Sequence, residues 1–383
     1  MASEGLVYRQ IQEWRNGGYR KEMRIEGLGD NKDEILDIPE THDGLPVTEM
    51  YFMRVPNPAI FDHVKVLRIS KNVTGIIGLG HFRNIESFEI DPENKNYSVK
   101  DGCLYYGWPG LQHPSMCRYP PKRPDKHFDL PEGTDFDEGC FAYASNLETV
   151  TIGDNTPFIP PGAFANCTAL KRIEIPPNVS EIRQAAFAGC VSLSEVVFKE
   201  GLCGNTRIYV IESGAFHGCC ALASFEIPSG CGEFDPSSLE CSGLKEIKGG
   251  CSGYQAVDGI LYATSLGGIH LALYPPCRPA QGRIYVVPEN VEYIDAPGFC
   301  HCESLRGLVL PVGIKEIDSC ALPGEGPLKT IYYRGTAEQW KAVKKHNYEP
   351  RKLYFFSKGK PTGKLRYWHF VDGVPTPWET DAL

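Results

Sequence analysis

Cysteine and histidine are the side chains in this sequence that most readily suggest chemistry. The chain holds fifteen cysteines and ten histidines. Two short stretches bring them together, Cys300-His301-Cys302 and His217 with Cys219-Cys220. Thiolates and imidazoles are zinc ligands, and a thiolate beside an imidazole is the usual cysteine nucleophile. The candidate chemistry is therefore a metal site or a cysteine nucleophile.

The motifs that would support a catalytic site are missing from the sequence. There is no Gly-x-Ser-x-Gly, no P-loop, no His-Glu-x-x-His and no Cys-x-x-Cys pair. No partner that would orient a catalytic base is indicated beside the histidines. Cys219 and Cys302 also occupy a position that recurs along the chain. We therefore predict no catalytic residue, no metal and no cofactor, and keep a Cys/His metal-dependent enzyme as a minor alternative.

The recurring cysteines belong to a repeat. Phe141, Phe164 and Phe187 lie 23 residues apart, and each is followed by apolar residues at matching spacings. After Phe164 the set reads Cys167, Leu170, Ile173, Ile175 and Pro176. Another copy starts at Phe216, and weaker copies contain Phe82, Leu239, Phe299 and Ile317. A fixed period of this length indicates a solenoid, in which each repeat buries its apolar stripe against its neighbours.

Each repeat has three predicted parts. Leu-x-x-Ile-x-Ile reads as a short strand, which a proline ends. A short apolar stub follows, for example Val179–Ile182. Ala-Phe-x-x-Cys then resembles one turn of helix. Stacked coils lie ~4.8 Å apart, so the repeated cysteines should form a buried ladder of small hydrophobic side chains. The odd number of cysteines argues against a disulfide framework.

Three regions follow from these patterns. Residues 1–36 contain a hairpin signal, Asn16-Gly17-Gly18, and would cap the array. Residues 37–335 hold the repeats, with inserted hairpins near 97–121 and 254–278. The two insertions share Tyr-x-x-x-Asp-Gly-x-Leu-Tyr, which suggests an internal duplication rather than two active sites. Residues 336–383 would form a second cap, with a capped helix over 336–346 and an aromatic hairpin. The alternative is that these aromatic residues form a binding patch.

The repeat Ala-Phe-x-x-Cys-x-x-Leu-x-x-Ile-x-Ile-Pro resembles the BspA-like, or Treponema-type, leucine-rich repeats of bacterial surface proteins. The segments at Asp37–Thr48 and Tyr367–Pro375 are similar to the beginning and end of many such proteins from gut anaerobes. The resemblance covers roughly residues 35–375. It implies an α/β leucine-rich-repeat solenoid, a curved right-handed coil with a parallel sheet of short strands. It also implies a non-enzymatic, surface-exposed or secreted protein that binds host proteins or other microbes.

The amino-acid composition limits the classes of molecule that this protein could bind. The net charge of −9 argues against binding to nucleic acid or to anionic membranes. No apolar run is long enough for a transmembrane helix, and no signal peptide is visible at the start. From the resemblance we expect the protein to be located on the cell surface or to be secreted. The alternative is an intracellular scaffold in the cytoplasm. The expected partner is another protein or a cell-surface macromolecule. The oligomeric state is not indicated, although a monomer is favoured.

A candidate binding face lies on the predicted strands. Residues between the buried positions should project from the sheet. The candidate ligand-binding residues are Thr149, Thr151, Arg172, Glu174, Glu195, Ser224, Glu226 and Glu246. Carboxylates recur and aromatic rings are scarce, so this face predicts a polar or basic protein partner rather than a glycan. An unliganded, solvated strand face is the alternative.

Overall fold

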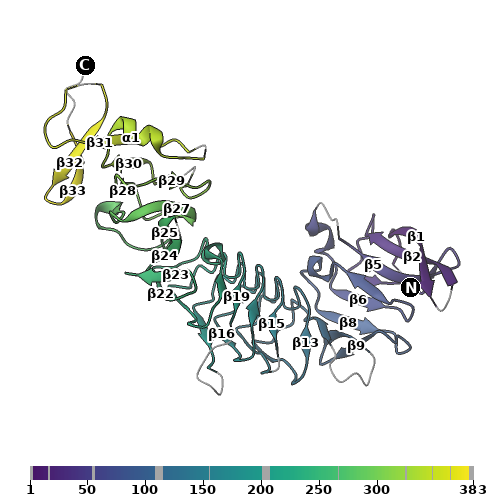
Figure 1. The fold of residues 1–383 in the computed structure, drawn as a ribbon. Helices are drawn as coiled ribbons and strands as arrows, with labels where there is room; N and C mark the ends of the chain where they lie inside the picture. The colour runs from purple at the N-terminus through teal and green to yellow at the C-terminus, as the bar shows by residue number, and fades with distance from the viewer. Residues whose placement is uncertain are drawn as a thin grey trace. The chain divides into compact units, whose positions relative to one another are not determined.

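The computed structural model describes residues 3–15, 18–53, 57–107, 115–154, 156–200, 208–265, 267–323, 326–346, 348–362 and 364–378. The chain forms two compact units, Met1–Cys203 and Gly204–Leu383 (Figure 1). Each unit is a stack of coils whose short strands pair in parallel with those of the next coil. The predicted solenoid of stacked parallel strands is confirmed.

The first unit opens with a long hairpin. β1 (Val7–Arg15) and β2 (Gly18–Gly27) pair antiparallel, and the Asn16-Gly17 part of the predicted turn lies outside the described residues. β2 then pairs in parallel with β5, which starts the first ladder of the solenoid. That sheet contains β1, β2, β4 (Thr41–His42), β5 (Leu45–Tyr51) and β7 (Gly75–Ile77). A second ladder contains β3 (Ile35–Asp37), β6 (Val66–Ile69) and β8 (Ser87–Ile90).

The central coils of this unit show the repeat most clearly. The Leu-x-x-Ile-x-Ile segments form one parallel ladder, and the stubs form another. The strand ladder is β12 (His127–Asp129), β14 (Thr149–Thr151), β16 (Arg172–Ile175) and β18 (Glu195–Phe198). The stub ladder of this unit includes β15 (Phe158–Ile159) and β17 (Glu181–Ile182). The short 3₁₀ segments η1 (Pro58–Phe61) and η2 (Leu79–His81) precede these coils.

The anchor phenylalanines lie in hydrogen-bonded turns rather than in helices. The amide of Cys167 donates to the carbonyl of Phe164, three residues earlier. The turns also bond to one another, since the Phe164 amide donates to the carbonyl of Ala186 in the next coil. The residue two places after each anchor has a left-handed backbone conformation. In successive coils of the first unit it is Tyr143 (φ 66°), Asn166 (φ 60°) and Gly189 (φ 73°). The turn therefore needs a residue that accepts a positive φ at this position.

The anchors stack in register, as the 23-residue spacing predicts. The ring centroids of Phe141 and Phe164 lie 4.9 Å apart with an interplanar angle of 7°, and those of Phe164 and Phe187 lie 5.1 Å apart at 2°. All three rings are fully buried. Cys167 and Cys190 are buried beside them. The predicted alignment of aromatic and thiol positions from coil to coil is confirmed.

Each insertion is a three-stranded antiparallel meander. In the first, β9 (Tyr97–Lys100), β10 (Cys103–Tyr106) and β11 (Ser115–Arg118) are followed in the sheet by β13 (Asp135–Phe136). Asp101 and Gly102 have φ values of 49° and 73°, the positive pair that a type I′ turn requires. The third strand of each insertion pairs in parallel with the next coil, β11 with β13 and β25 with β27. The insertions thus rejoin the solenoid.

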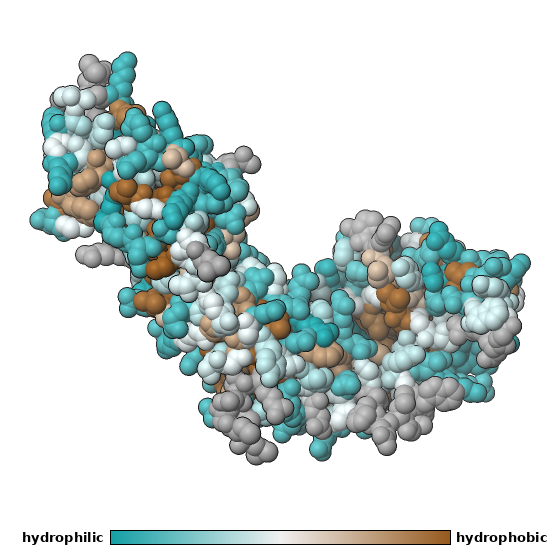
Figure 2. Space-filling view, viewed as in Figure 1, coloured by the Kyte–Doolittle hydropathy of each residue, from teal (hydrophilic) through white to brown (hydrophobic). Residues whose placement is uncertain are grey.

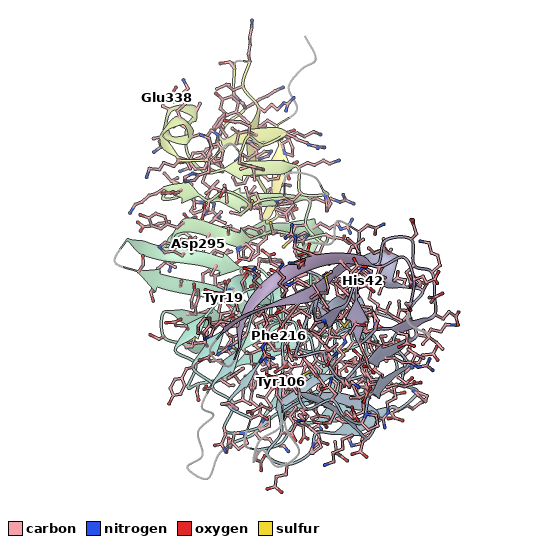
Figure 3. All side chains as sticks on the ribbon, turned by 90° about the vertical axis from the view of Figure 1, so that its right-hand side faces the viewer. Tyr19, His42, Tyr106, Phe216, Asp295 and Glu338 are labelled. Atoms are coloured by element: carbon pink, nitrogen blue, oxygen red, sulfur yellow. The ribbon has the colours of Figure 1, made fainter. Side chains whose placement is uncertain are left out.

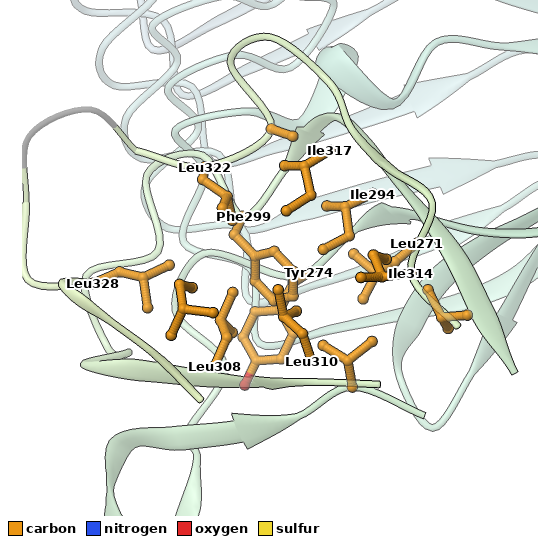
Figure 4. Close-up of a cluster of buried hydrophobic side chains, with 14 of the residues drawn as sticks. Leu271, Tyr274, Ile294, Phe299, Leu308, Leu310, Ile314, Ile317, Leu322 and Leu328 are labelled. Carbon is orange, nitrogen blue, oxygen red and sulfur yellow. The ribbon is translucent and has the colours of Figure 1, made fainter. Parts of the chain in front are cut away.

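The second unit repeats this architecture. Its stub ladder contains β19 (Val210–Ile211) and β21 (Glu233–Phe234). One sheet contains β20 (Ser224–Ile227), β22 (Glu246–Cys251), the insertion strands β23 (Tyr254–Val257), β24 (Ile260–Ser265) and β25 (Gly268–Leu273), then β27 (Val291–Gly298) and β29 (Glu316–Ile317). The 3₁₀ segments are η3 (Pro236–Leu239) and η4 (Gln281–Arg283). Figure 4 shows the core, in which the rings of Tyr274 and Phe299 lie 5.3 Å apart.

The remaining strands carry the chain to its end. β26 (Ile284–Val286), β28 (Gly307–Leu310), β30 (Thr330–Tyr333) and β31 (Lys352–Phe356) are parallel, and the hairpin β32 (Tyr367–Val371) and β33 (Val374–Pro377) completes the sheet. The predicted helix is present as α1 (Ala337–Ala342), and Thr336 and Gln339 form its capping box. It ends four residues earlier than predicted, because Lys344 forms a β-bridge with Glu316. The domain boundaries at 36 and 335 stay predictions.

Candidate functional site

The predicted binding face of the first unit is a grid of aligned polar side chains. Parallel pairing places Thr149 beside His127 on one side and Arg172 on the other, and Arg172 beside Glu195. Residues that alternate with them, such as Val150 and Ile173, are buried. The predicted orientation of these strands is therefore correct, with one face in the core and the other toward solvent.

Most charges on this face already have an intramolecular partner. The Arg172 guanidinium donates to Glu195 at 2.9 Å through Nε and to Glu174 through a second nitrogen. Lys199 Nζ also lies 2.6 Å from Glu174. These cross-strand pairs link successive coils through their side chains as well as through the backbone.

The threonines of the face are paired as well. His127 Nδ1 lies 2.7 Å from the Thr149 hydroxyl, and its Nε2 lies 3.0 Å from Asp129. Hydrogen bonds from Thr151 and then from His127 lower the pKa of the Asp129 carboxyl. The face therefore presents hydroxyl and carboxylate groups that are oriented by neighbouring coils.

The candidate residues of the second unit are also polar and solvent-facing. Ser224 pairs with Glu246, and Glu226 pairs with Lys248, across β20 and β22. Lys248 Nζ lies 2.8 Å from the Glu246 carboxylate. The hydrogen bond to Glu246 and the negative charge of Glu226 both raise the pKa of Lys248. A basic partner was predicted because carboxylates recur on this face. Several of these carboxylates form ion pairs with a lysine or arginine of this chain, so their charge is already balanced.

Glu174 should contribute to the pH dependence of stability. Lys199 first and Arg172 second lower its pKa below the ordinary value of a glutamate. A carboxyl whose pKa is lower in the folded state stabilises the fold above its unfolded pKa, and this contribution is lost as the pH falls through the folded pKa. Glu174→Gln should therefore lower the melting temperature at pH 7, and lower it less at about pH 4, just under the ordinary pKa of a glutamate. Calorimetric scans between these pH values test this, and an equal shift at both would contradict it.

Charge reversal at Glu174 would affect more than a binding surface. A lysine at this position would stand beside Arg172 and Lys199, and like charges in contact destabilise a sheet. Loss of binding in Glu174→Lys would thus be mixed with loss of stability. A surface test must use a different residue.

The buried cysteines do more than fill space. Cys167 Sγ donates to the Phe141 carbonyl at 3.0 Å, and Cys190 Sγ donates to the Phe164 carbonyl at 3.1 Å. In the second unit Cys302 contacts the Tyr274 carbonyl in the same way, at 3.5 Å. The Phe141 and Phe164 carbonyls also accept the amides of Ala144 and Cys167, so each of these thiols supplies a second hydrogen bond to a carbonyl of the preceding coil. The sequence predicted only their small hydrophobic role.

Thiol reactivity should separate the cysteines into two groups. Burial raises the pKa of Cys302 and of Cys140, so these thiols are protonated at neutral pH and shielded from reagents. Cys220, Cys277 and Cys320 are exposed. We expect iodoacetamide to modify the exposed three in the folded protein and Cys140 and Cys302 only after addition of guanidinium. Peptide mapping by mass spectrometry measures this, and early modification of Cys302 would contradict the buried ladder.

The sequence candidates for a metal site do not converge. Cys302 and Cys219 point into the core, whereas His301 is exposed. Within the described ranges, no group of three or more histidine, cysteine, aspartate or glutamate side chains could hold a metal ion. All cysteines of these ranges are free thiols.

Two further features lie in the second unit: a polar network that the sequence did not indicate, and the aromatic tail, for which a binding patch was the alternative to a cap. Ser265, His270 and Asp295 form a chain of hydrogen bonds on the second insertion. The aromatic tail buries Trp368 against Val309 and Tyr332 on the sheet face. Among the described residues, no helix has the length and apolar character needed to cross a bilayer.

The comparisons with known proteins agree with this architecture. The model of the BspA type leucine-rich repeat region matches residues 134–264 and 283–342 in six copies. No curated protein matches the chain in sequence. Similar solved structures include a leucine-rich cell surface protein of Faecalibacterium prausnitzii, at 18% identity and a TM-score of 0.41 over 88% of this chain and 96% of that one. A leucine-rich repeat protein of Bacteroides ovatus is 16% identical, with a TM-score of 0.38, over 92% and 99% of the two chains.

A third structure, the leucine-rich repeat protein of T. pallidum, is 19% identical with a TM-score of 0.35 and covers 62% of this chain and 85% of its own. The matched repeats contain the coils whose anchor stacking and thiol contacts are described above. The chain therefore belongs to the BspA-type leucine-rich repeat family.

Proposed function

We propose that this protein is an interaction scaffold of a bacterial cell surface, which binds another protein through the polar face of β12, β14, β16 and β18. The family and the cell-surface description of the F. prausnitzii protein support the location. The observation that carries the proposal is the register of the face, in which oriented hydroxyl, carboxylate and guanidinium groups repeat across four paired strands.

The chemistry of the face favours a polar partner. Its charges are mutually paired, so binding would rely on hydrogen bonds to ordered groups more than on net charge. Figure 2 shows a surface on which hydrophilic colours dominate and hydrophobic colours gather in patches. An adhesin or a receptor-like scaffold is the finer interpretation that we propose, with the identity of the partner to be found by capture from host and bacterial extracts.

A single exposed threonine offers a clean test of the face. Thr151 lies at the end of β14 and faces solvent. Thr151→Arg should weaken binding of a captured partner by at least about tenfold, because a bulky side chain at a packed interface costs more than ~1.4 kcal/mol. The melting temperature should change little. Surface plasmon resonance with the immobilised partner measures the affinity.

The matched control lies on the anchor turn of the same coil stack. Thr168 is also an exposed threonine, but it follows the anchor Phe164 and not a strand of the candidate face. Thr168→Arg should leave the affinity unchanged. Equal weakening by both variants would point to a non-specific charge effect, and no weakening by Thr151→Arg would remove this face from consideration.

A further inference from the structure

Ser265, His270 and Asp295 have the hydrogen-bond topology of a serine nucleophile, its general base and the carboxylate that positions the base. The Ser265 hydroxyl lies 2.8 Å from His270 Nε2, and His270 Nδ1 lies 2.8 Å from Asp295 Oδ1. Ser265 ends β24, His270 lies in β25 and Asp295 lies in β27. Figure 3 marks Asp295 on these strands.

The network favours the tautomer that a catalytic histidine needs. The Asp295 carboxylate accepts, so Nδ1 carries the proton. Nε2 is then an acceptor and takes the hydrogen bond from the Ser265 hydroxyl. The imidazole is also held in place by Tyr293, whose ring is stacked on it at 4.3 Å with an angle of 12°. With its side chain 18% exposed, His270 is largely shielded from water, whereas Ser265 is exposed to it.

The internal duplication supplies a comparison within the same chain. Tyr105 pairs with Met116 in the first insertion, and the matching Tyr262 pairs with Leu271 in the second. One pair closer to the connection between the second and third strands, Tyr106 pairs with Ser115 in the first insertion and Ala263 pairs with His270 in the second. Ser115 and His270 therefore occupy equivalent positions. Asp137 and Asp295 are equivalent as well, because each follows the residue that pairs with Met116 or Leu271 in the next coil.

Among its described residues, the first insertion has only part of this network. There the Ser115 hydroxyl donates directly to Asp137. The second insertion keeps the aspartate, has an imidazole in place of the serine, and adds a second serine, Ser265, on the far side of that imidazole. An aspartate with a hydrogen-bond donor is thus the shared structural element, and within the part of the chain that the structure describes the serine–imidazole pair is found in the second copy.

Two hydrogen-bond donors lie near the Ser265 hydroxyl. The Gly267 amide donates to Ser265 Oγ at 3.1 Å. A Cβ atom on Gly267 would lie 3.5 Å from Ser265 Oγ and 3.4 Å from the Tyr293 hydroxyl. Glycine therefore leaves both donors uncovered by a side chain, and the Tyr293 O–H is the donor that we assign to an oxyanion formed on the acyl group. The Glu292 carboxylate beside Gly268 disfavours an anionic acyl group.

We propose that Ser265, His270 and Asp295 form a site that hydrolyses esters of small uncharged acyl groups. Ser265 Oγ attacks the carbonyl carbon, and its proton passes to His270 Nε2. The tetrahedral intermediate collapses, the ester C–O bond breaks, and His270 returns the proton to the leaving alcohol. Water then attacks the acyl-serine and gives a proton to His270. The bond between the acyl carbon and Ser265 Oγ breaks, His270 returns the proton to Ser265 Oγ, and the carboxylic acid leaves. This activity goes beyond the proposed binding function and modifies the expectation of a protein without catalytic residues.

A fluorophosphonate probe tests the nucleophile directly. The full chain is treated with the probe, and the modified peptide is identified by mass spectrometry. We expect a label on Ser265 and hydrolysis of 4-nitrophenyl acetate that Ser265→Ala abolishes. His270→Ala should slow labelling by about a hundredfold or more, the lower range for general-base catalysis. Ser115→Ala is the matched control, since Ser115 also donates to an aspartate and contacts no imidazole of the described residues, and it should leave both signals unchanged.

The role of Asp295 needs a separate measurement because it is a positioning residue. Asp295→Asn should slow labelling and also change the nitrogen-15 chemical shifts of the His270 ring, which report the tautomer. Asp295→Glu should restore part of the rate. Melting temperatures verify that each variant is folded. An unlabelled Ser265 in the folded protein, or a label whose rate does not depend on His270, would overturn the proposal and leave these contacts as turn and strand pairing only.

Discussion

Replacing Phe164 by alanine is expected to lower the free energy of unfolding by about 3–5 kcal/mol. The ring is fully buried and stacks on Phe141 at 4.9 Å and on Phe187 at 5.1 Å, so its removal leaves a cavity between two coils. The 23-residue repeat predicts a loss of the same size for Phe187→Ala. Guanidinium denaturation followed by circular dichroism measures both losses.

An exposed apolar residue of the same region is the control. Val191 is 44% exposed, just after the buried Cys190. Val191→Ala should change the free energy of unfolding by less than about 0.5 kcal/mol. If Phe164→Ala were no more costly than Val191→Ala, the stacked rings would not be what holds the coils together.

Replacing Trp368 by alanine should have the second large effect, about 3–5 kcal/mol at the C-terminal sheet. The indole is fully buried, and its Nε1 donates to the Tyr333 carbonyl at 3.0 Å. Its ring contacts Phe356 and Phe370 edge-on, with centroids 5.2 and 4.9 Å away. Hydrogen exchange should show loss of amide protection in β31, β32 and β33, because local stability there depends on this side chain.

The same variant separates the two interpretations of the aromatic tail. A cap would lose amide protection when Trp368 is removed, whereas a binding patch would lose only its ligand. Phe370 is the control, since its side chain is 38% exposed on the same strand and Phe370→Ala should cost less. Equal protection in the wild-type protein and in Trp368→Ala would contradict the role of a cap.

The sequence predicted the solenoid because its core positions repeat. Any apolar residue at the anchor position, such as Phe141, faces the same residue one coil away, so spacing alone defines the stack. The Asp-Gly turns were also readable, since Asp258 and Gly259 take the positive φ values that their types favour. The length of helix α1 could not be predicted from the sequence, because the helix ends just before Lys344 forms a β-bridge with Glu316 of a distant strand.

Side-chain pairing on the candidate face could not be read from a list of exposed positions. Arg172 contacts Glu195, 23 residues away, and also Glu174 on its own strand. Which carboxylate an arginine selects depends on rotamers and on the register of two coils. The exposed positions of the strands could be read from the sequence, whereas the ion pairs between them could not, and the binding role of the face stays a prediction.

The Ser265–His270–Asp295 network left no motif, because its members come from three strands and are separated by unequal distances along the chain. One signal was available. Aligning the two insertions on their shared Tyr-Pro-Pro, at Tyr119 and Tyr274, matches Ser115 with His270. The sequence therefore offered a serine-to-histidine difference, whereas the equivalence of Asp137 and Asp295 comes from strand register.

The coil-to-coil hydrogen bonds of the anchor turns and thiols have a consequence for a tethered molecule under load. Each coil is fastened only to its immediate neighbours, as in the contact of Cys190 with the Phe164 carbonyl. Tension on one terminus would therefore peel turns away one after another, each adding ~80 Å of slack for 23 extended residues. A stack of this kind extends in small steps under tension, whereas a closed globular domain unfolds in a single step.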